Sequence, residues 1–111
     1  MRYVRGERFD EYVRRTKDVL VARRTLRQAR VLDELHVNQR ELNRPGKNVL
    51  VTPTRQVVIL DFERATRSRP RNVSQLGQWT ARVFDIDARK ALERYKRELT
   101  DRSFKDLLKL F

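Results

Sequence analysis

The chain has 111 residues and no cysteine, and its 27 Lys and Arg residues against 15 Asp and Glu residues give a formal net charge of +12. A chain of this length is expected to form one domain over residues 1–111, and without cysteine it has neither disulfides nor thiolate chemistry. No apolar run approaches the roughly 20 residues that span a bilayer, and the N-terminal segment lacks the apolar core of a secretory signal. We therefore expect a cytoplasmic protein without a membrane partner.

The positive charge has two interpretations. Most of the basic residues are arginine, whose planar guanidinium is suited to bidentate contacts with phosphate. A polyanionic partner is the first interpretation, either nucleic acid, nucleotide phosphate or an acidic protein. The second is an arginine-rich composition in which long side chains cover helix faces and pair with Glu and Asp. Net charge bears on association and not on fold, so both interpretations stay open.

The first third of the chain is predicted to be mainly helical. Residues 1–8 form a short extended segment that turns at Gly6, and residues 10–15 can form a short helix. From residue 16 to residue 35 the pattern is strongly helical, because apolar residues recur at steps of three and four. They predict a stripe that faces the core, made of Val19, Ala22, Leu26, Ala29 and Leu32 and widened by Val31 and Leu35.

Residues 39–63 predict a β-hairpin with polar groups at its open end. Two β-rich runs, 49–52 and 57–60, flank a turn at residues 53–56 that contains a proline. Glu41 and Asn48 precede the first strand, and Asp61 follows the second. A hairpin brings its ends together, so we expect these three side chains to meet. Carboxylate and amide oxygens are the ligands that Mg²⁺ prefers, and the sequence therefore predicts a site for a hard cation.

The last part of the chain combines a basic segment with helices over residues 72–111. No acid occurs from residue 64 to residue 84. The basic segment is either a docking surface for a phosphate-bearing partner or a polar loop, and its candidate side chains are Arg64, Arg67, Arg69 and Arg71. The helices are expected to begin at an N-cap Asn72, at a cap formed by Asp85 or Asp87, and at a weak capping box over residues 103–106. Trp79 and Phe84 are expected in the core, and the fold class is α+β, mostly helical.

The stretch 39–63 resembles the catalytic core of the protein-kinase fold, in which a loop of the H-R-D-L…N type precedes a hairpin and D-F-G follows it. Residues 39–42, Gln-Arg-Glu-Leu, resemble the first motif, Asn48 resembles its metal-binding Asn, and residues 61–63, Asp-Phe-Glu, resemble D-F-G with Glu in place of Gly. The likeness is nearest to the large, C-terminal lobe of atypical archaeal Ser/Thr kinases of the RIO type. Residues 1–8 resemble the hinge between the lobes. Residues 72–77 resemble the segment D-x-W-S-x-G, whose first residue supports the catalytic loop.

This resemblance implies phosphoryl transfer from Mg²⁺-bound ATP. It implies that Asp61 is the main metal ligand, that Asn48 is the second, and that Glu41 stands in the place of the catalytic Asp. Lys47 and Arg44 are weaker candidates for phosphate contacts. The chain contains neither the Gly-rich loop nor the strand lysine of the family.

Because those elements are missing, we expect a lobe that is a fragment, is completed by a partner protein, or is inactive. The alternative is a basic module of the same fold that binds RNA, DNA or an acidic protein, with RNA favoured over DNA. A helical DNA-binding domain without kinase ancestry ranks third, because residues after 72 supply no clear recognition helix.

The missing small lobe also bears on assembly. Tyr3, Val4 and Phe9, with the outer residues of 49–51 and 57–60, are predicted to leave an apolar patch beside an open strand edge. We therefore expect a homodimer or a partner that supplies the missing lobe. The alternative is that the N-terminal segment folds back and the chain stays monomeric.

Overall fold

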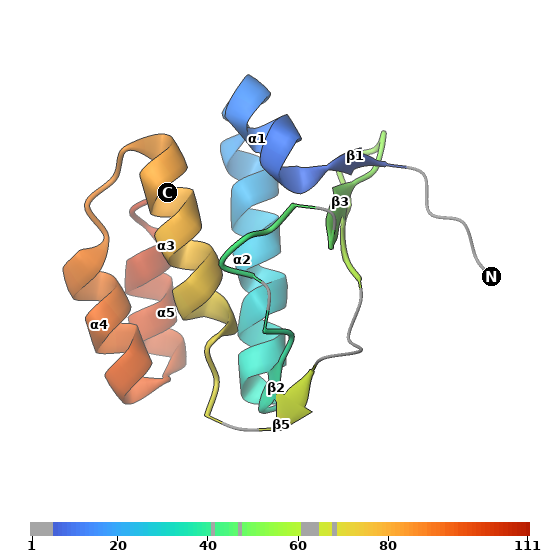
Figure 1. Cartoon of the computed structure of the whole chain (residues 1–111). Helices are drawn as coiled ribbons and strands as arrows, with labels where there is room; N and C mark the ends of the chain where they lie inside the picture. The colour runs from blue at the N-terminus through green and yellow to red at the C-terminus, as the bar shows by residue number, and fades with distance from the viewer. Residues whose placement is uncertain (1–5, 41, 47, 61–64, 68) are drawn as a thin grey trace.

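In the computed structural model of the chain, which describes residues 6–40, 42–46, 48–60, 65–67 and 69–111, the long helix α2 runs through the middle of the molecule (Figure 1). Helices α3, α4 and α5 lie on one side of α2, and the strands β1, β3 and β4 lie on the other. The result is an α+β fold dominated by helix, as predicted. In chain order the elements are β1 (Glu7–Arg8), α1 (Phe9–Thr16), α2 (Val19–Glu34), β2 (Val37–Asn38), β3 (Val49–Val51), β4 (Val57–Ile59), β5 (Thr66–Arg67), α3 (Asn72–Phe84), α4 (Arg89–Glu98) and α5 (Asp101–Leu108).

The boundary between α1 and α2 is set by two polar residues. Lys17 adopts the left-handed conformation with φ 53° and closes α1, and its N–H donates to the carbonyl of Val13 at 2.8 Å. Asp18 then caps α2, because its carboxylate accepts a hydrogen bond from the N–H of Val21 at 3.2 Å. The helix predicted from residue 16 therefore begins only at Val19.

The predicted apolar stripe of α2 is only partly buried. Ala22, Leu26 and Ala29 lie in the core, but Val19, Val31 and Leu35 are 42%, 52% and 60% exposed. The predicted widening of the stripe is therefore wrong. At about 100° per residue, Val31 and Leu35 lie on the side of the helix opposite Leu26. Val19 is the first residue of the helix.

The predicted hairpin is confirmed. Strands β3 and β4 pair antiparallel, with Val49 opposite Ile59 and Val51 opposite Val57. The turn between them is closed by the N–H of Thr52, which donates to the carbonyl of Gln56 at 2.8 Å. Strand β1 pairs antiparallel with the other edge of β3, so the sheet has the order β1-β3-β4.

Part of the predicted apolar patch is buried within the chain. Phe9, Val49, Val51 and Val57 are buried, and the ring of Phe9 packs against Trp79 with 5.4 Å between the ring centroids. Strand β1 occupies one edge of β3. Tyr3 and Val4 lie outside the described residues, and the outer residues Leu50, Val58, Ile59 and Leu60 are only partly buried. The expected homodimer or partner protein at this surface stays a prediction.

A second, two-stranded sheet joins distant parts of the chain. Strands β2 and β5 pair antiparallel, with Val37 opposite Arg67. Helix α3 follows. Asn72 was predicted to be its N-cap, but the N-cap is Arg71 and Asn72 is the first helical residue. Trp79 is buried and Phe84 is partly buried against the core, as predicted.

The last two helices begin differently from the predictions. Asp87, one of the two acids expected to cap α4, accepts a hydrogen bond from the N–H of Arg89 at 3.2 Å. Asp85 instead ends α3 in the left-handed conformation, with φ 54°. The capping box of α5 lies three residues before the predicted one: Thr100 and Ser103 exchange hydrogen bonds between their hydroxyls and backbone N–H groups, each at 3.2 Å. The predicted box was misplaced because a serine hydroxyl, and not only Glu or Gln, can accept at the third helical position.

None of the helices in the described part of the chain is long and apolar enough to cross a membrane.

Candidate functional site

The open end of the hairpin and the start of the loop before it lie together. The N–H of Leu60 donates to the carbonyl of Asn48 at 2.7 Å, so Asn48 faces the residue immediately before Asp61. The side-chain amide of Gln39 donates to the carbonyl of Leu60 at 3.1 Å. Gln39 is fully buried and Asn48 is 7% exposed. The fold therefore brings residues 39 and 48 to the end of the second strand.

Several predicted site residues lie outside the described part of the chain, namely Glu41, Lys47, Asp61 and Arg64. The predicted meeting of Glu41, Asn48 and Asp61 stays a prediction. Among the described residues no group of three or more His, Cys, Asp or Glu side chains is arranged to hold a metal ion. That finding does not extend to Glu41 and Asp61.

Asn72, at the start of α3, holds the beginning of the loop in place. Its Oδ1 accepts a hydrogen bond from the backbone N–H of Gln39 at 3.0 Å. Its Nδ2 donates to the carbonyl of Val37 at 2.6 Å and to Oδ1 of Asp33 at 2.9 Å. The side chain is 1% exposed, so this buried amide has partners on both its oxygen and its nitrogen, as a buried polar group requires.

Asp33, on α2, is a buried carboxylate beneath this loop. It is 2% exposed, and it accepts hydrogen bonds from the backbone N–H of Asn72 at 2.9 Å and from the hydroxyl of Tyr95 on α4. Burial and then the bond to Asp33 raise the pKa of Tyr95 above its ordinary value. Sequence reasoning missed this network. The available signal was an acid that continues the stripe of Leu26 and Ala29 at the next four-residue step.

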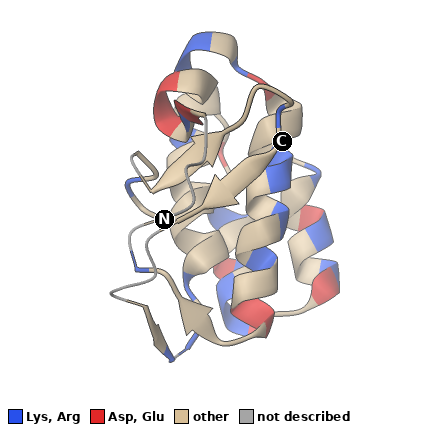
Figure 2. Cartoon of the chain, turned by 90° about the vertical axis from the view of Figure 1, so that its right-hand side faces the viewer, with Lys and Arg blue, Asp and Glu red and all other residues tan. Residues whose placement is uncertain are grey.

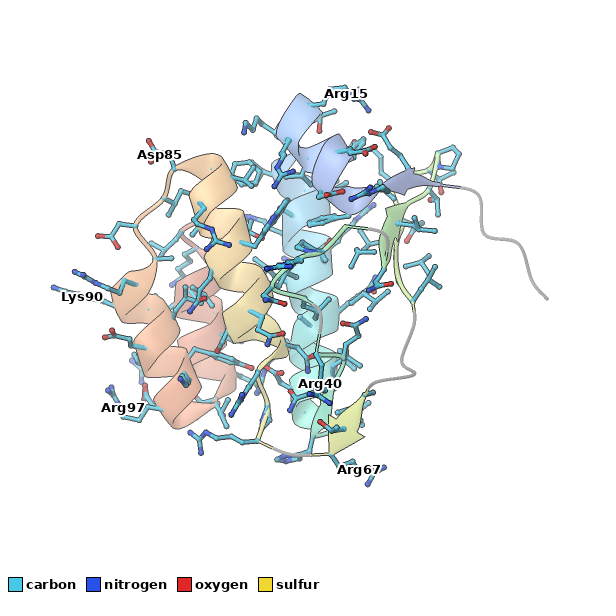
Figure 3. All side chains as sticks on the ribbon, viewed as in Figure 1. Arg15, Arg40, Arg67, Asp85, Lys90 and Arg97 are labelled. Atoms are coloured by element: carbon cyan, nitrogen blue, oxygen red, sulfur yellow. The ribbon has the colours of Figure 1, made fainter. Side chains whose placement is uncertain are left out.

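The basic segment after the hairpin is tied to the same region. The side chain of Asn38 donates to the carbonyl of Arg69 at 2.9 Å and accepts from the N–H of Arg71 at 2.8 Å. Arg67, Arg69 and Arg71 are exposed. Figure 3 shows Arg67 at the same end of the molecule as Arg40, which belongs to the loop. Three of the four predicted polyanion-binding arginines therefore lie on one exposed segment beside the loop.

A cavity of about 900 Å³ opens on the other side of the loop. It lies between residues of β1 and α1, residues 43–46 and 48, and one face of α3. Its described lining is Arg8, Asp10, Arg14, Asn43, Arg44, Pro45, Gly46, Asn48, Gln75, Gln78, Trp79 and Arg82. Arg44, a predicted phosphate-contacting residue, is part of this lining. The sequence did not predict that the other charged residues of the lining, Arg8, Asp10, Arg14 and Arg82, would meet. The spacing of Asp10 and Arg14 shows only that these two share a face of one helix. No local pattern shows that α1 and α3 face each other.

Several basic side chains form ion pairs with acids, both between elements and along a helix. Arg55 Nη2 lies 2.8 Å from Asp18 Oδ1, and Arg30 Nη2 lies 2.9 Å from Asp101 Oδ1. Arg94 pairs with Glu98 one turn further along α4, and in Figure 2 blue and red segments alternate along helices. Ion pairing therefore engages part of the basic residues, and with 15 acids against 27 bases a large excess remains.

Comparison of the chain with protein-family models, with curated proteins and with solved structures found no match. Function is therefore inferred from the residues and their geometry alone.

Proposed function

We propose that the chain acts as the large lobe of a kinase-like phosphotransferase, with the nucleotide-binding lobe supplied by another polypeptide segment. The observation that carries the proposal is the arrangement at the open end of the hairpin. The N–H of Leu60, the residue before Asp61 in the sequence, donates to the carbonyl of Asn48. Gln39 is bonded to Leu60 as well. The proposal adds that the carboxylate of Asp61 lies beside Asn48, as a loop of the H-R-D…N type and a D-F-G segment require.

A second contact supports the proposal. The resemblance gave the first residue of D-x-W-S-x-G the task of supporting the catalytic loop, and Asn72 occupies that position in the sequence. Its Oδ1 accepts a hydrogen bond from the N–H of Gln39, the first residue of the loop motif. An amide oxygen serves as well as a carboxylate oxygen for this purpose, because the partner is a neutral backbone donor.

The residues present fit a hard divalent cation, because the amide oxygen of Asn48 and the carboxylate of Asp61 are oxygen donors. Together they would hold Mg²⁺, which when bound neutralises charge on the phosphates. Glu41 would orient the acceptor hydroxyl or take its proton. The 111 residues contain no Gly-rich loop and no strand lysine, so they do not fit the phosphates of ATP by themselves.

The proposal is tested by nucleotide and metal binding to the isolated chain. We expect negligible phosphoryl transfer to a generic protein acceptor and weak binding of Mn²⁺ in the presence of ATP, followed by electron paramagnetic resonance. Asp61→Asn should weaken Mn²⁺ binding about tenfold or more, since it removes the charged oxygen ligand.

The matched control is Asp85→Asn, which changes an exposed acid at the far end of α3, and it should leave Mn²⁺ binding unchanged (Figure 3). Equal effects of the two substitutions would remove the proposed metal site. Turnover at ordinary kinase rates that Asp61→Asn abolishes would show that no second lobe is needed.

A second candidate function is the binding of RNA through the basic segment. The observation in its favour is that Arg67, Arg69 and Arg71 are exposed together on residues 65–71. Such binding is electrostatic and independent of sequence, and it does not require the metal site.

A further inference from the structure

The Arg-lined cavity, defined as the hollow of about 900 Å³ described above, carries a strong local excess of positive charge. Among the described residues, the lining contains four arginines, Arg8, Arg14, Arg44 and Arg82, and one acid, Asp10. A cavity of this size lies within the usual range for sites that enclose a ligand. Like charges gathered around a hollow raise its electrostatic potential and favour an anionic occupant.

Two of the four arginines are engaged with Asp10. Nη2 of Arg8 lies 3.0 Å from Oδ2 of Asp10, and Nη1 of Arg14 lies 3.9 Å from the same oxygen. Gly46 lets the first pair lie against the loop, because a Cβ at that position would meet Nη2 of Arg8 at 2.6 Å. Nη1 of Arg8 also lies 3.7 Å from Oε1 of Glu11. Two carboxylates therefore face these two guanidinium groups, and the excess positive charge of the cavity comes from Arg44 and Arg82.

The other two arginines, Arg44 and Arg82, are exposed. Neither forms an ion pair with any acid in the described part of the chain. They approach the cavity from different elements, one from the loop before the hairpin and one from α3. Two guanidinium groups that line one hollow can each donate paired hydrogen bonds to an entering carboxylate or phosphate.

The cavity also has a fixed aromatic surface. Trp79 is 5% exposed, its ring packs on Phe9 with 5.4 Å between centroids, and the guanidinium of Arg14 lies 5.4 Å from the ring centroid. The side-chain amides of Gln75 and Gln78 add hydrogen-bond donors along the same face of α3. A rigid wall with several donors lowers the entropy that binding must overcome.

We propose that this cavity binds an acidic segment of a polypeptide, one rich in Asp, Glu or phosphorylated side chains. The hollow shape favours side chains that reach inward from an extended peptide, whereas the backbone of a nucleic-acid duplex presents a convex surface. Asn48 lies in the lining of the same cavity, so an acidic segment bound here places its neighbouring residues at the open end of the hairpin. The suggestion that the acidic segment belongs to the acceptor substrate rests on the proposed function. The binding of an acidic segment in the cavity does not depend on that function.

The experiment uses the fluorescence of Trp79, the only tryptophan in the chain. The full chain is titrated with a short oligo-glutamate peptide at low salt, with an oligo-glutamine peptide of equal length as the uncharged control. We expect the emission of Trp79 to change with oligo-glutamate only. Arg82→Gln and Arg44→Gln should each raise the Kd about tenfold, because each removes a charge-assisted contact.

The matched control variant is Arg97→Gln, which removes an exposed arginine on α4, far from the hairpin (Figure 3). It should leave the Kd within about twofold of the parent value. Arg44 and Arg82 lie on different elements, so if one of the two variants does not fold, the other carries the test.

The proposal is overturned if neither fluorescence nor calorimetry detects oligo-glutamate, or if Arg97→Gln weakens binding as much as Arg82→Gln does. It is also overturned if an oligothymidylate of equal charge binds more tightly than the peptide and loses affinity in the same two variants, since the cavity would then be a nucleic-acid site. If the unmodified chain binds oligo-glutamate but does not bind Mn²⁺, the proposed phosphotransferase function is rejected and this inference stands.

Discussion

At the scale of single residues, a buried carboxylate organises the start of α3. Asp33 accepts hydrogen bonds from the backbone and side chain of Asn72 and from Tyr95. The oxygen of the same Asn72 side chain then accepts from Gln39. The carboxylate of Asp33 therefore links α2 to α3 and α4, and Asn72 links this group to the loop. The geometry of the loop depends on these buried residues.

Replacing this carboxylate should be among the most damaging single changes. Asp33→Ala leaves the donors of Asn72 and Tyr95 buried without an acceptor, and we expect the free energy of unfolding to fall by about 3 kcal/mol. Tyr95→Phe removes one donor only and should cost about 1 kcal/mol. Urea denaturation measures both. Glu93→Ala, at an exposed acid of α4, is the control, and the network would lose its assigned importance if Asp33→Ala were no worse than this control.

Asp18 gives the folded state a pH dependence. Its carboxylate caps α2 and pairs with Arg55 at 2.8 Å. The hydrogen bond from Arg55, assisted by those from Tyr12 and the N–H of Val21, lowers the pKa of Asp18 from 3.8 to about 2 against the opposing effect of burial. Since the folded pKa is below the unfolded one, the stabilisation is complete above the unfolded value and is lost as the pH falls through the folded value.

The substitution Arg55→Gln tests this ion pair. Residue 55 has a positive φ of 63°, and glutamine is chosen because, unlike glycine, it does not relieve the backbone strain at that position. Because half of the Arg55 side chain is exposed, we expect the free energy of unfolding to fall only slightly at neutral pH. The difference between variant and parent should shrink as the pH is lowered from about 4 to about 2, and Arg97→Gln should show no such trend. A difference that is constant over this range would mean that the ion pair does not stabilise the fold.

At the scale of elements, the contact between α3 and α4 depends on a glycine. A Cβ at Gly77 would meet Cδ2 of Leu92 at 2.7 Å, and Leu92 is only 8% exposed. Glycine is a poor helix former in the middle of α3, so its presence is explained by the close approach of the neighbouring helix.

A double-mutant cycle separates these two effects. Gly77→Ala should lower the free energy of unfolding by about 1 kcal/mol, because the clash outweighs the gain in helix propensity. In a Leu92→Ala background the same substitution should instead raise it by up to about 1 kcal/mol, since the obstructing side chain is gone. Thermal or urea denaturation of the four proteins decides between these outcomes. The same effect in both backgrounds would show that Leu92 does not restrict position 77.

At the scale of the whole molecule, the charge is distributed in two ways. Arginines and acids pair along the helices, while Arg67, Arg69 and Arg71 stand exposed on one segment beside the loop. A partner that follows this segment would be held by electrostatic contacts, whose strength depends on salt.

Binding of a short RNA duplex should therefore weaken steeply between low and moderate salt. Changing Arg67, Arg69 and Arg71 together to Gln should reduce the slope of log K against log salt by roughly two to three, because each phosphate contact contributes somewhat less than one. The control removes three exposed cations on α4, Arg89, Lys90 and Arg97, and should change the slope by less than one. No binding at low salt, a flat salt dependence or an equal effect of the control would exclude the basic segment as an RNA site.

Some features followed from local sequence. Thr52 to Gln56 is a turn because a proline and polar residues separate two runs of β-branched residues. The buried part of α2 followed from the spacing of Ala22, Leu26 and Ala29. The closeness of Asn48 to the end of the second strand followed from the hairpin itself, since pairing of two adjacent strands fixes which residues face each other.

Other features depended on elements that are distant in sequence. Asn72 resembled an N-cap in sequence, and only the approach of the loop gave its side chain different partners. The burial of Phe9 likewise depended on Trp79, which is 70 residues further along the chain.

Local sequence is sufficient to predict the helices and the hairpin, because turn residues, caps and short-range periodicity act over a few residues of chain. Only the packing of distant elements places Asp33 beneath the loop and brings Arg44 and Arg82 to one cavity. Those contacts join α2 to α3 and α4 and the loop to α3, and local propensities carry no information about which faces of distant elements will pack together. Burial of a shared apolar core determines which faces pack together, and this packing in turn determines where the charged side chains lie.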